Sequence, residues 1–160
     1  MEKARENLQL TQQESEAVSQ LSVPSHLPNV DSSFYEHFCL RGIRVDRVEP
    51  GVIVCSFRVP PRLIDKTGKL ATGAIINFVD EVGGAVAHVE GLPVAANVSV
   101  DMSISFHSTA HADDELEITS KLLGRKGGYT GTVVVLRNKA TGELIAEGRH
   151  SLFGRHASKM

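Results

Sequence analysis

The segment TGAIINFVDEVGGAVAHVEGLP, residues 72–93, carries the strongest structural signal in this 160-residue chain. Its apolar residues recur at helical spacing; they are Ala74, Ile75, Phe78, Val79, Val82, Ala85, Val86 and Val89. Three internal glycines each weaken the helix propensity by about 1 kcal/mol relative to Ala, so tertiary burial must stabilise such a helix. The pattern predicts a long buried helix that begins near Thr72 and ends before Gly91.

Strand patterns lie on both sides of this helix. Before it, residues 43–49 and 52–59 flank a Pro-Gly turn and predict a hairpin. After it come four runs rich in β-branched residues, separated by AHADDE, GRKGG and NKATGE; the runs are 95–107, 116–123, 129–138 and 144–152. A short helix is predicted at residues 33–40, with Ser33 as its N-cap.

This order of elements predicts an α+β fold. Consecutive strands joined by short loops are antiparallel when they pair, and an apolar helix must be covered by the one buried face of the sheet. We therefore expect a hotdog architecture, a curved antiparallel sheet wrapped around one long central helix. The expected domain spans residues 33–156, preceded by a helical or extended arm at 1–32 and followed by a tail at 157–160.

Composition excludes several classes of protein. The chain is 41% apolar and 22% charged, with a formal net charge of −2 and no long run of one sign, which argues against a nucleic-acid partner. No apolar run is long enough to span a membrane. The two cysteines are predicted to be reduced structural thiols. The final tripeptide, Ser158-Lys159-Met160, differs by one residue from the peroxisomal address SKL, so a peroxisomal location is expected, and otherwise a cytoplasmic one.

Three segments resemble the PaaI-type hotdog acyl-CoA thioesterases. They are LATGAIINFVDE (70–81), VSVDMSISF (98–106) and NKATGELIAEGRH (138–150). The resemblance covers residues 34–153 and implies hydrolysis of acyl-CoA thioesters to the free acid and CoA. It also implies a homodimer, often paired into a homotetramer, with each active site built across two subunits. We predict no cofactor and no metal, since the histidines show no metal-ligand spacing.

The resemblance places the chemistry at the start and middle of the long helix. Asp80 is the expected general base or nucleophile, and it interrupts an apolar stretch that offers a carboxylate no partner. The backbone N–H groups of Thr72 and Gly73 would form the oxyanion hole. Ser99 would hydrogen-bond the attacking water or the carboxylate, and Asp65 occupies the position of a family Asn.

Three positions depart from the family pattern. Asp65 replaces an Asn that can donate as well as accept, and two carboxylates near one site would raise the pKa of at least one of them. Ala71 and Thr72 stand where the family has His and Gly. Glu81 points about 100° away from its neighbour around the helix, so we expect it to be exposed and outside the site.

The resemblance also implies CoA contacts at the end of one strand and in the loop between the following two strands. These residues are Phe106, His107, Ser108, Arg125, Lys126, Gly127 and Gly128. Arg125 and Lys126 lie between glycines, and two cations on a flexible backbone suit the phosphates of CoA. The alternative is that this segment is only a solvated hairpin tip. Two other functions remain open at this point, a non-catalytic acyl-CoA-binding hotdog and a hotdog dehydratase or hydratase.

Overall fold

The computed structural model describes residues 2–25, 33–89 and 94–156. The chain divides into two compact units, residues 1–38 and 39–160, whereas the sequence placed the start of the domain at residue 33. The division falls inside helix α3 (Phe34–Leu40), whose predicted cap is present, since the Ser33 hydroxyl accepts the Glu36 N–H at 3.5 Å. The predicted tail, residues 157–160, lies outside the described residues.

The first unit contains helices α1 (Glu2–Leu8) and α2 (Gln12–Ser19), both without buried residues. A capping box begins α2: the Thr11 hydroxyl accepts the Glu14 N–H at 3.2 Å, and the Glu14 carboxylate accepts the Thr11 N–H at 2.8 Å. The arm is therefore helical, held by local hydrogen bonds rather than by a core.

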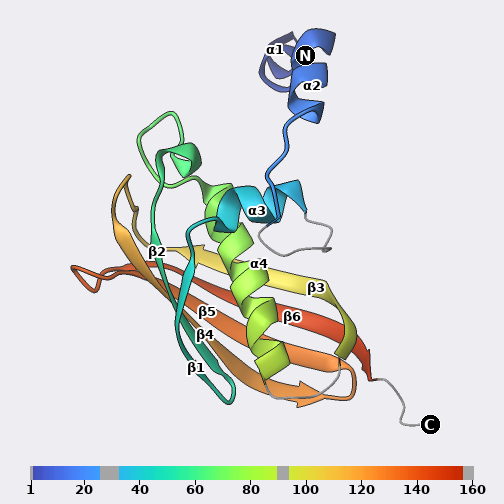
Figure 1. Ribbon diagram of the computed structural model, residues 1–160, viewed down its shortest axis with the longest axis vertical. Helices are drawn as coiled ribbons and strands as arrows, with labels where there is room; N and C mark the ends of the chain where they lie inside the picture. Colours follow the sequence, from blue (N-terminus) through green and yellow to red (C-terminus); the bar gives the residue numbers. More distant parts are fainter. Residues whose placement is uncertain (1, 26–32, 90–93, 157–160) are drawn as a thin grey trace. The chain divides into compact units, whose positions relative to one another are not determined.

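The second unit is one antiparallel six-stranded sheet in the order β1-β2-β4-β5-β6-β3 with helix α4 (Thr72–Val89) across one face (Figure 1). The strands are β1 (Arg44–Glu49), β2 (Val52–Arg58), β3 (Val94–Phe106), β4 (Glu115–Lys126), β5 (Tyr129–Asn138) and β6 (Leu144–His156), and a short 3-10 turn, η1 (Pro61–Leu63), precedes α4. Helix α4 packs against β2, β3, β4, β5 and β6. The predicted α+β class and the sheet-wrapped helix are confirmed.

The β4–β5 hairpin is longer than predicted. The sequence ended its first strand at Leu123 because of GRKGG, yet β4 pairs with β5 as far as Lys126 and Tyr129. A bulge at Leu123 absorbs the irregularity, and Gly127 turns the chain with a φ of +59°, which glycine adopts without a Cβ penalty. The glycines that suggested a loop therefore form a two-residue turn.

The core lies between α4 and the inner face of the sheet. Phe78 of α4 meets Phe57 of β2 edge to face, with ring centroids 4.8 Å apart. The helix approaches the sheet closely at Gly148 of β6, where a Cβ would lie 2.6 and 2.7 Å from the two methyl groups of Val79. Glycine there lets the helix sit directly on the strand, and this contact sets the height of the next residue, Asp80, above the sheet.

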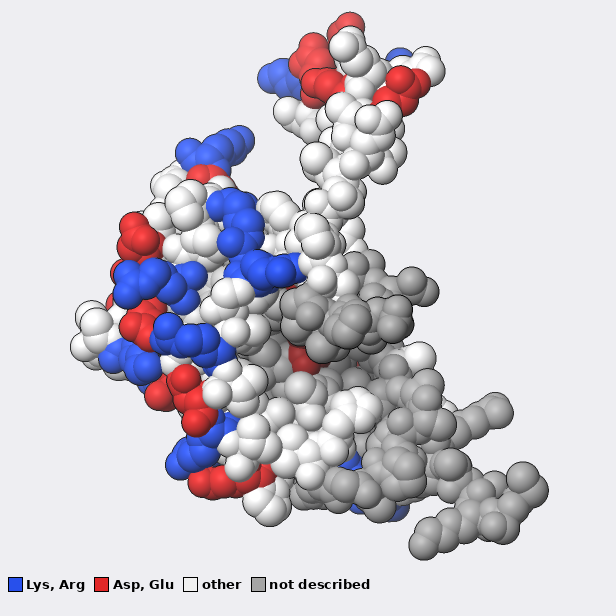
Figure 2. All heavy atoms as spheres, in the orientation of Figure 1, with Lys and Arg blue, Asp and Glu red and all other residues white. Residues whose placement is uncertain are grey.

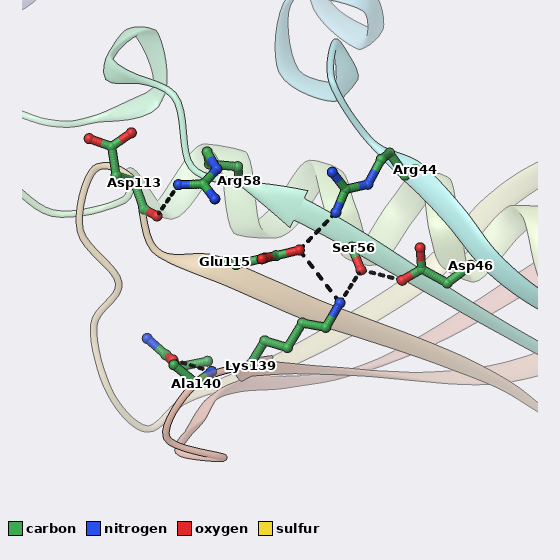
Figure 3. Close-up of polar contacts among 9 residues, drawn as sticks. Arg44, Asp46, Ser56, Arg58, Asp113, Glu115, Lys139 and Ala140 are labelled. Atoms are coloured by element: carbon green, nitrogen blue, oxygen red, sulfur yellow. Dashed lines mark hydrogen bonds and ion pairs between the residues drawn. The ribbon is translucent and has the colours of Figure 1, made fainter.

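Strand β1 is exposed along its whole length and is tied down by a polar cluster (Figure 3). A bulge leaves Asp46 free to accept the hydroxyl of buried Ser56. The Lys139 ammonium donates to Ser56 Oγ at 2.9 Å and lies 3.5 Å from Glu115, which also pairs with Arg44 at 2.7 Å. These two cations, Lys139 first, lower the pKa of Glu115. The cluster thus links β1, β2, β4 and the β5–β6 turn.

No helix within the described residues combines the length and the apolar character needed to cross a bilayer.

Candidate active site

Asp80 lies in the middle of α4 on the one helix face that the sheet leaves uncovered. This face consists of residues spaced by four, Thr72, Ile76, Asp80, Gly84 and His88, all of them exposed or half-exposed. The apolar composition of this helix predicts complete burial, but one face of the helix is accessible to solvent. The sheet covers one side of α4, and the side along edge strand β3 stays open. The Asp80 side chain is 40% exposed.

Two side chains from neighbouring strands converge on Asp80. Ser99 of β3 donates its hydroxyl to Asp80 Oδ1 at 2.8 Å. His150 of β6 places Nε2 2.9 Å from Ser99 Oγ and 3.3 Å from Asp80 Oδ1. The fold thus brings Asp80 and Ser99 together, as predicted. The Asp80 carboxylate has no partner within its own helix, but it contacts two side chains of the sheet, Ser99 and His150.

His150 is the residue that sequence reasoning missed. It lies at an inward position of β6, in alternation with buried Gly148 and Leu152. That period-two pattern was the available signal. The ring is completely buried, and burial lowers the pKa of His150 while the Asp80 carboxylate opposes the shift.

A cavity of about 370 Å³ opens beside this cluster. Its walls come from α4, β3 and β6, and it is lined by Asp80, Glu81, Gly84, Ala85, His88, Ser99 and Leu152. Glu81 therefore lines the same cavity as Asp80 and is half-exposed, contrary to our expectation. The reason is that the accessible surface of α4 extends beyond the residues spaced by four: Ala85 is exposed and Glu81 is half-exposed.

The predicted oxyanion donors, the N–H groups of Thr72 and Gly73, lie at the start of α4, about two helical turns before Asp80. The carbonyl of Ala71 accepts the N–H groups of Ala74 and Ile75 at 3.0 and 3.3 Å, so α4 starts at Thr72 as predicted. Thr72 precedes Asp80 by eight residues, which corresponds to about 12 Å along the helix axis. Within one copy of the chain, these donors and Asp80 cannot act on the same carbonyl group.

Asp65 builds a turn. Its Oδ1 accepts the Thr67 N–H and hydroxyl, both at 2.7 Å, and the Lys69 N–H at 3.2 Å. These hydrogen bonds, those from Thr67 foremost, lower the pKa of Asp65. Our expectation that paired carboxylates would raise a pKa is therefore wrong for Asp65, because its charge is stabilised by local donors.

The two predicted CoA-binding segments lie at opposite ends of the sheet. Phe106 ends β3 beside Ala146, whereas Val98, near the other end of β3, is level with Phe153 and Tyr129 at the β4–β5 turn. Eight residues of strand separate these two ends, or about 26 Å. At the first end, the Ser108 hydroxyl donates to Glu143 at 2.6 Å and the His107 N–H to the Ile145 carbonyl at 2.9 Å.

At the second end, the Arg125 guanidinium donates to the carbonyl of Ala87 in the last turn of α4, where a cation also complements the helix dipole. Lys126, Gly127 and Gly128 form the adjacent tip of the hairpin. On the face of the molecule seen in Figure 2, Lys and Arg side chains alternate with Asp and Glu, and no field of one sign develops. Among the residues that the structure describes, no three His, Cys, Asp or Glu side chains group as metal ligands would.

Comparison with known proteins matches these features to one family. The model of the family described as the thioesterase superfamily matches residues 67–145. Human acyl-coenzyme A thioesterase 13 is 35% identical over 104 residues, which cover 64% of this chain and 72% of that protein. The structure of zebrafish thioesterase superfamily member 2 has a TM-score of 0.67 at 30% identity and covers 72% of this chain and 83% of that one. The Escherichia coli PaaI protein, 16% identical, shares the fold with a TM-score of 0.66 over 75% of this chain and 90% of its own.

Proposed function

The chain belongs to the thioesterase superfamily and is a thioester hydrolase of the hotdog fold, and we propose that it cleaves acyl-CoA thioesters with Asp80 as general base or nucleophile. The observation that carries the proposal is the contact of Asp80 with Ser99 beside an open cavity. Both contacts that the carboxylate makes, to Ser99 and to His150, use Oδ1, so Oδ2 has no protein partner among the described residues and can meet a water or a thioester carbon.

A second copy of the chain would complete this site. Each copy carries two half-sites: Thr72 with residues 106–108 at one end, and Asp80 with Ser99 towards the other. The loop contacts support the first grouping, since the Leu70 N–H donates to the Ala110 carbonyl at 2.8 Å and His111 Nδ1 lies 2.9 Å from the Gly68 carbonyl. The positive end of the helix dipole at Thr72 would then stabilise the oxyanion of the partner's substrate.

The spacing on α4 supports one particular two-fold arrangement. Ile76 is 42% exposed on the uncovered face of the helix, four residues from both Thr72 and Asp80. If two antiparallel helices cross at Ile76, Thr72 of each copy faces Asp80 of the other. Strand β3, the edge of the sheet, would pair with its own copy and remove an exposed edge. We propose this homodimer as the active unit, with pairing of dimers into a tetramer as a further step.

The reaction is tested by measuring free CoA release from acyl-CoAs of increasing chain length. We expect turnover by the native protein and a loss of about 10²- to 10⁴-fold in Asp80→Asn and Asp80→Ala, as for removal of a general base. Glu81→Gln is the matched control, because Glu81 is the neighbouring carboxylate in the same cavity. Binding of acyl-CoA without turnover would instead indicate a binding protein, and full turnover in both Asp80 variants would reject the role of Asp80.

Mixing two inactive variants tests the composite site. Thr72→Pro removes one helix N–H at the first helical position, where Pro is tolerated, and Asp80→Asn removes the base. Random exchange of subunits gives hybrids with one intact site, so about one quarter of the native activity should return if each site spans two copies. A site within one copy would give no recovery. Ile76→Glu should be a monomer in a sedimentation experiment, and it should release no CoA in the activity assay.

We propose, separately, that Ser158-Lys159-Met160 acts as a peroxisomal address where it forms the free C-terminus. The last ten residues fused to a fluorescent reporter should give punctate peroxisomal signal. Replacement of Met160 by Asp is the control, and a diffuse signal from the native tail would reject the address.

A further inference from the structure

We propose that His150 is a positioning residue for the hydrolysis: its fixed Nε2–H holds the Ser99 hydroxyl in the orientation that donates to Asp80. The inference rests on the proposed function of Asp80. Its basis is a compact triangle of contacts: His150 Nε2 lies 2.9 Å from Ser99 Oγ and 3.3 Å from Asp80 Oδ1, and Ser99 Oγ lies 2.8 Å from Asp80 Oδ1.

The proton positions follow from counting donors in this triangle. An ionised carboxylate only accepts, so the single proton of the Ser99 hydroxyl goes to Asp80 Oδ1. Ser99 Oγ must then accept from His150, which requires a proton on Nε2. The opposite tautomer would leave two lone pairs facing one another at one of the two contacts and would bury an Nδ1–H that has no acceptor among the described residues. Burial lowers the pKa of His150 and so favours the neutral ring.

The inferred proton on Nε2 argues against a serine nucleophile. In a Ser-His-Asp triad, the carboxylate orients the histidine through Nδ1–H while Nε2 accepts the serine proton. Here the carboxylate lies on the Nε2 side, 3.3 Å away, and Nδ1 has no hydrogen-bond partner within the described part of the chain. With its proton on Nε2, His150 does not serve as the base for Ser99, and the proposal predicts that Ser99 carries no acyl group during turnover.

Packing around the ring fixes its orientation. A Cβ on Gly83 of α4 would lie 3.0 Å from His150 Nδ1, so the ring stacks directly against the helix backbone. The same Cβ would lie 3.2 Å from Thr132 Oγ1 and from a methyl group of Val134, and Thr132 is the cross-strand neighbour of His150 on β5. A buried ring packed this closely against α4 is held against a flip that would present Nδ1, and such preorganisation keeps the hydroxyl aligned without the help of substrate.

The test compares two substitutions of similar size. His150→Gln keeps an N–H donor at the end of the side chain, whereas His150→Leu fills the space without one. Loss of a residue that orients a catalytic group typically lowers activity about 10- to 100-fold. We expect that loss in kcat for His150→Leu, with KM changed less than about twofold and melting temperature recorded for both. His150→Gln should recover most of kcat.

A double substitution separates positioning from a general structural effect. Because His150 acts through Ser99 and Asp80, adding His150→Leu to Asp80→Asn should lower kcat no further. Native kcat in His150→Leu, equal losses in Leu and Gln variants of equal stability, or a further loss in the Asp80→Asn background would each overturn the inference. If Asp80→Asn itself kept native turnover, the proposed function of Asp80 would fail instead.

The tautomer gives a second measurement that needs no variant to fold. Long-range proton–nitrogen NMR spectra of the native protein at pH 7 should show His150 as a neutral ring protonated at Nε2. A ring protonated at Nδ1, or a cation, would overturn the assignment of donors, and so would an acyl group trapped on Ser99 during turnover.

Discussion

Gly148→Ala tests the contact that sets the position of the active-site helix. The new Cβ would lie 2.6 and 2.7 Å from the two methyl groups of Val79, whereas carbon atoms normally approach to about 3.5–4.0 Å. The helix and strand must therefore separate by about 1 Å, because a β-branched side chain in a helix has essentially one rotamer. We expect a loss of about 3 kcal/mol in the free energy of unfolding, at the upper end for overpacking.

The same shift should also reduce the rate of catalysis. Asp80 follows Val79, and His150 lies two residues from Gly148, so both of these members of the triangle of contacts move. A misplacement of about 1 Å can cost about 100-fold in rate. The stability change is measured by urea denaturation at one fixed protein concentration, because an oligomer's stability depends on it. The expected loss of about 3 kcal/mol in the free energy of unfolding corresponds to a fall of about 6–12 °C in melting temperature for a chain of this size.

A double-mutant cycle identifies the cause. Val79→Ala removes two buried methyl groups and should cost about 2–3 kcal/mol alone. Combined with Gly148→Ala, it also removes the clash, so the double variant should be at least about 2 kcal/mol more stable than the sum predicts. Gly131→Ala is the matched control, since its Cβ would meet only Leu123 at 3.9 Å. A native-like Gly148→Ala, or strict additivity, would refute the reasoning.

Three further results are expected. Asp65→Ala should lower the urea midpoint at pH 7; since the pKa of Asp65 is lowered in the fold, its contribution is present above the unfolded pKa of about 4, and the difference from the native chain should narrow as the pH falls below that value. The free energy of unfolding of the native protein should decrease as the pH falls below about 6.5, because His150 binds a proton more readily in the unfolded state. The His150→Gln variant should lack this contribution to the pH dependence of stability. Burial and, secondarily, the charge of Asp46 raise the pKa of the Cys55 thiol to about 11, so iodoacetamide at pH 8 should alkylate Cys55 only after unfolding, as peptide mass analysis would show.

Local signals were sufficient for most of the elements. The apolar period of residues 72–89, the Pro50-Gly51 turn and the Ser33 cap each specify structure within a few residues, and each prediction is confirmed. The bulge at Leu123 was not predictable, because it depends on how β4 pairs with β5. Likewise β3 pairs with β6 at the edge of the sheet rather than with β4, the next strand in the chain.

The amino-acid sequence by itself determined that one apolar helix is wrapped by an antiparallel sheet, and the family resemblance singled out Asp80 and Ser99 as a pair. Only the tertiary structure decided which other residues contact this pair and which do not. His150 reaches Ser99 because β6 lies beside β3, and Asp65 is engaged in its own turn. The physical reason is that strand pairing joins residues 51 positions apart in the chain, and no local pattern records which strands become neighbours.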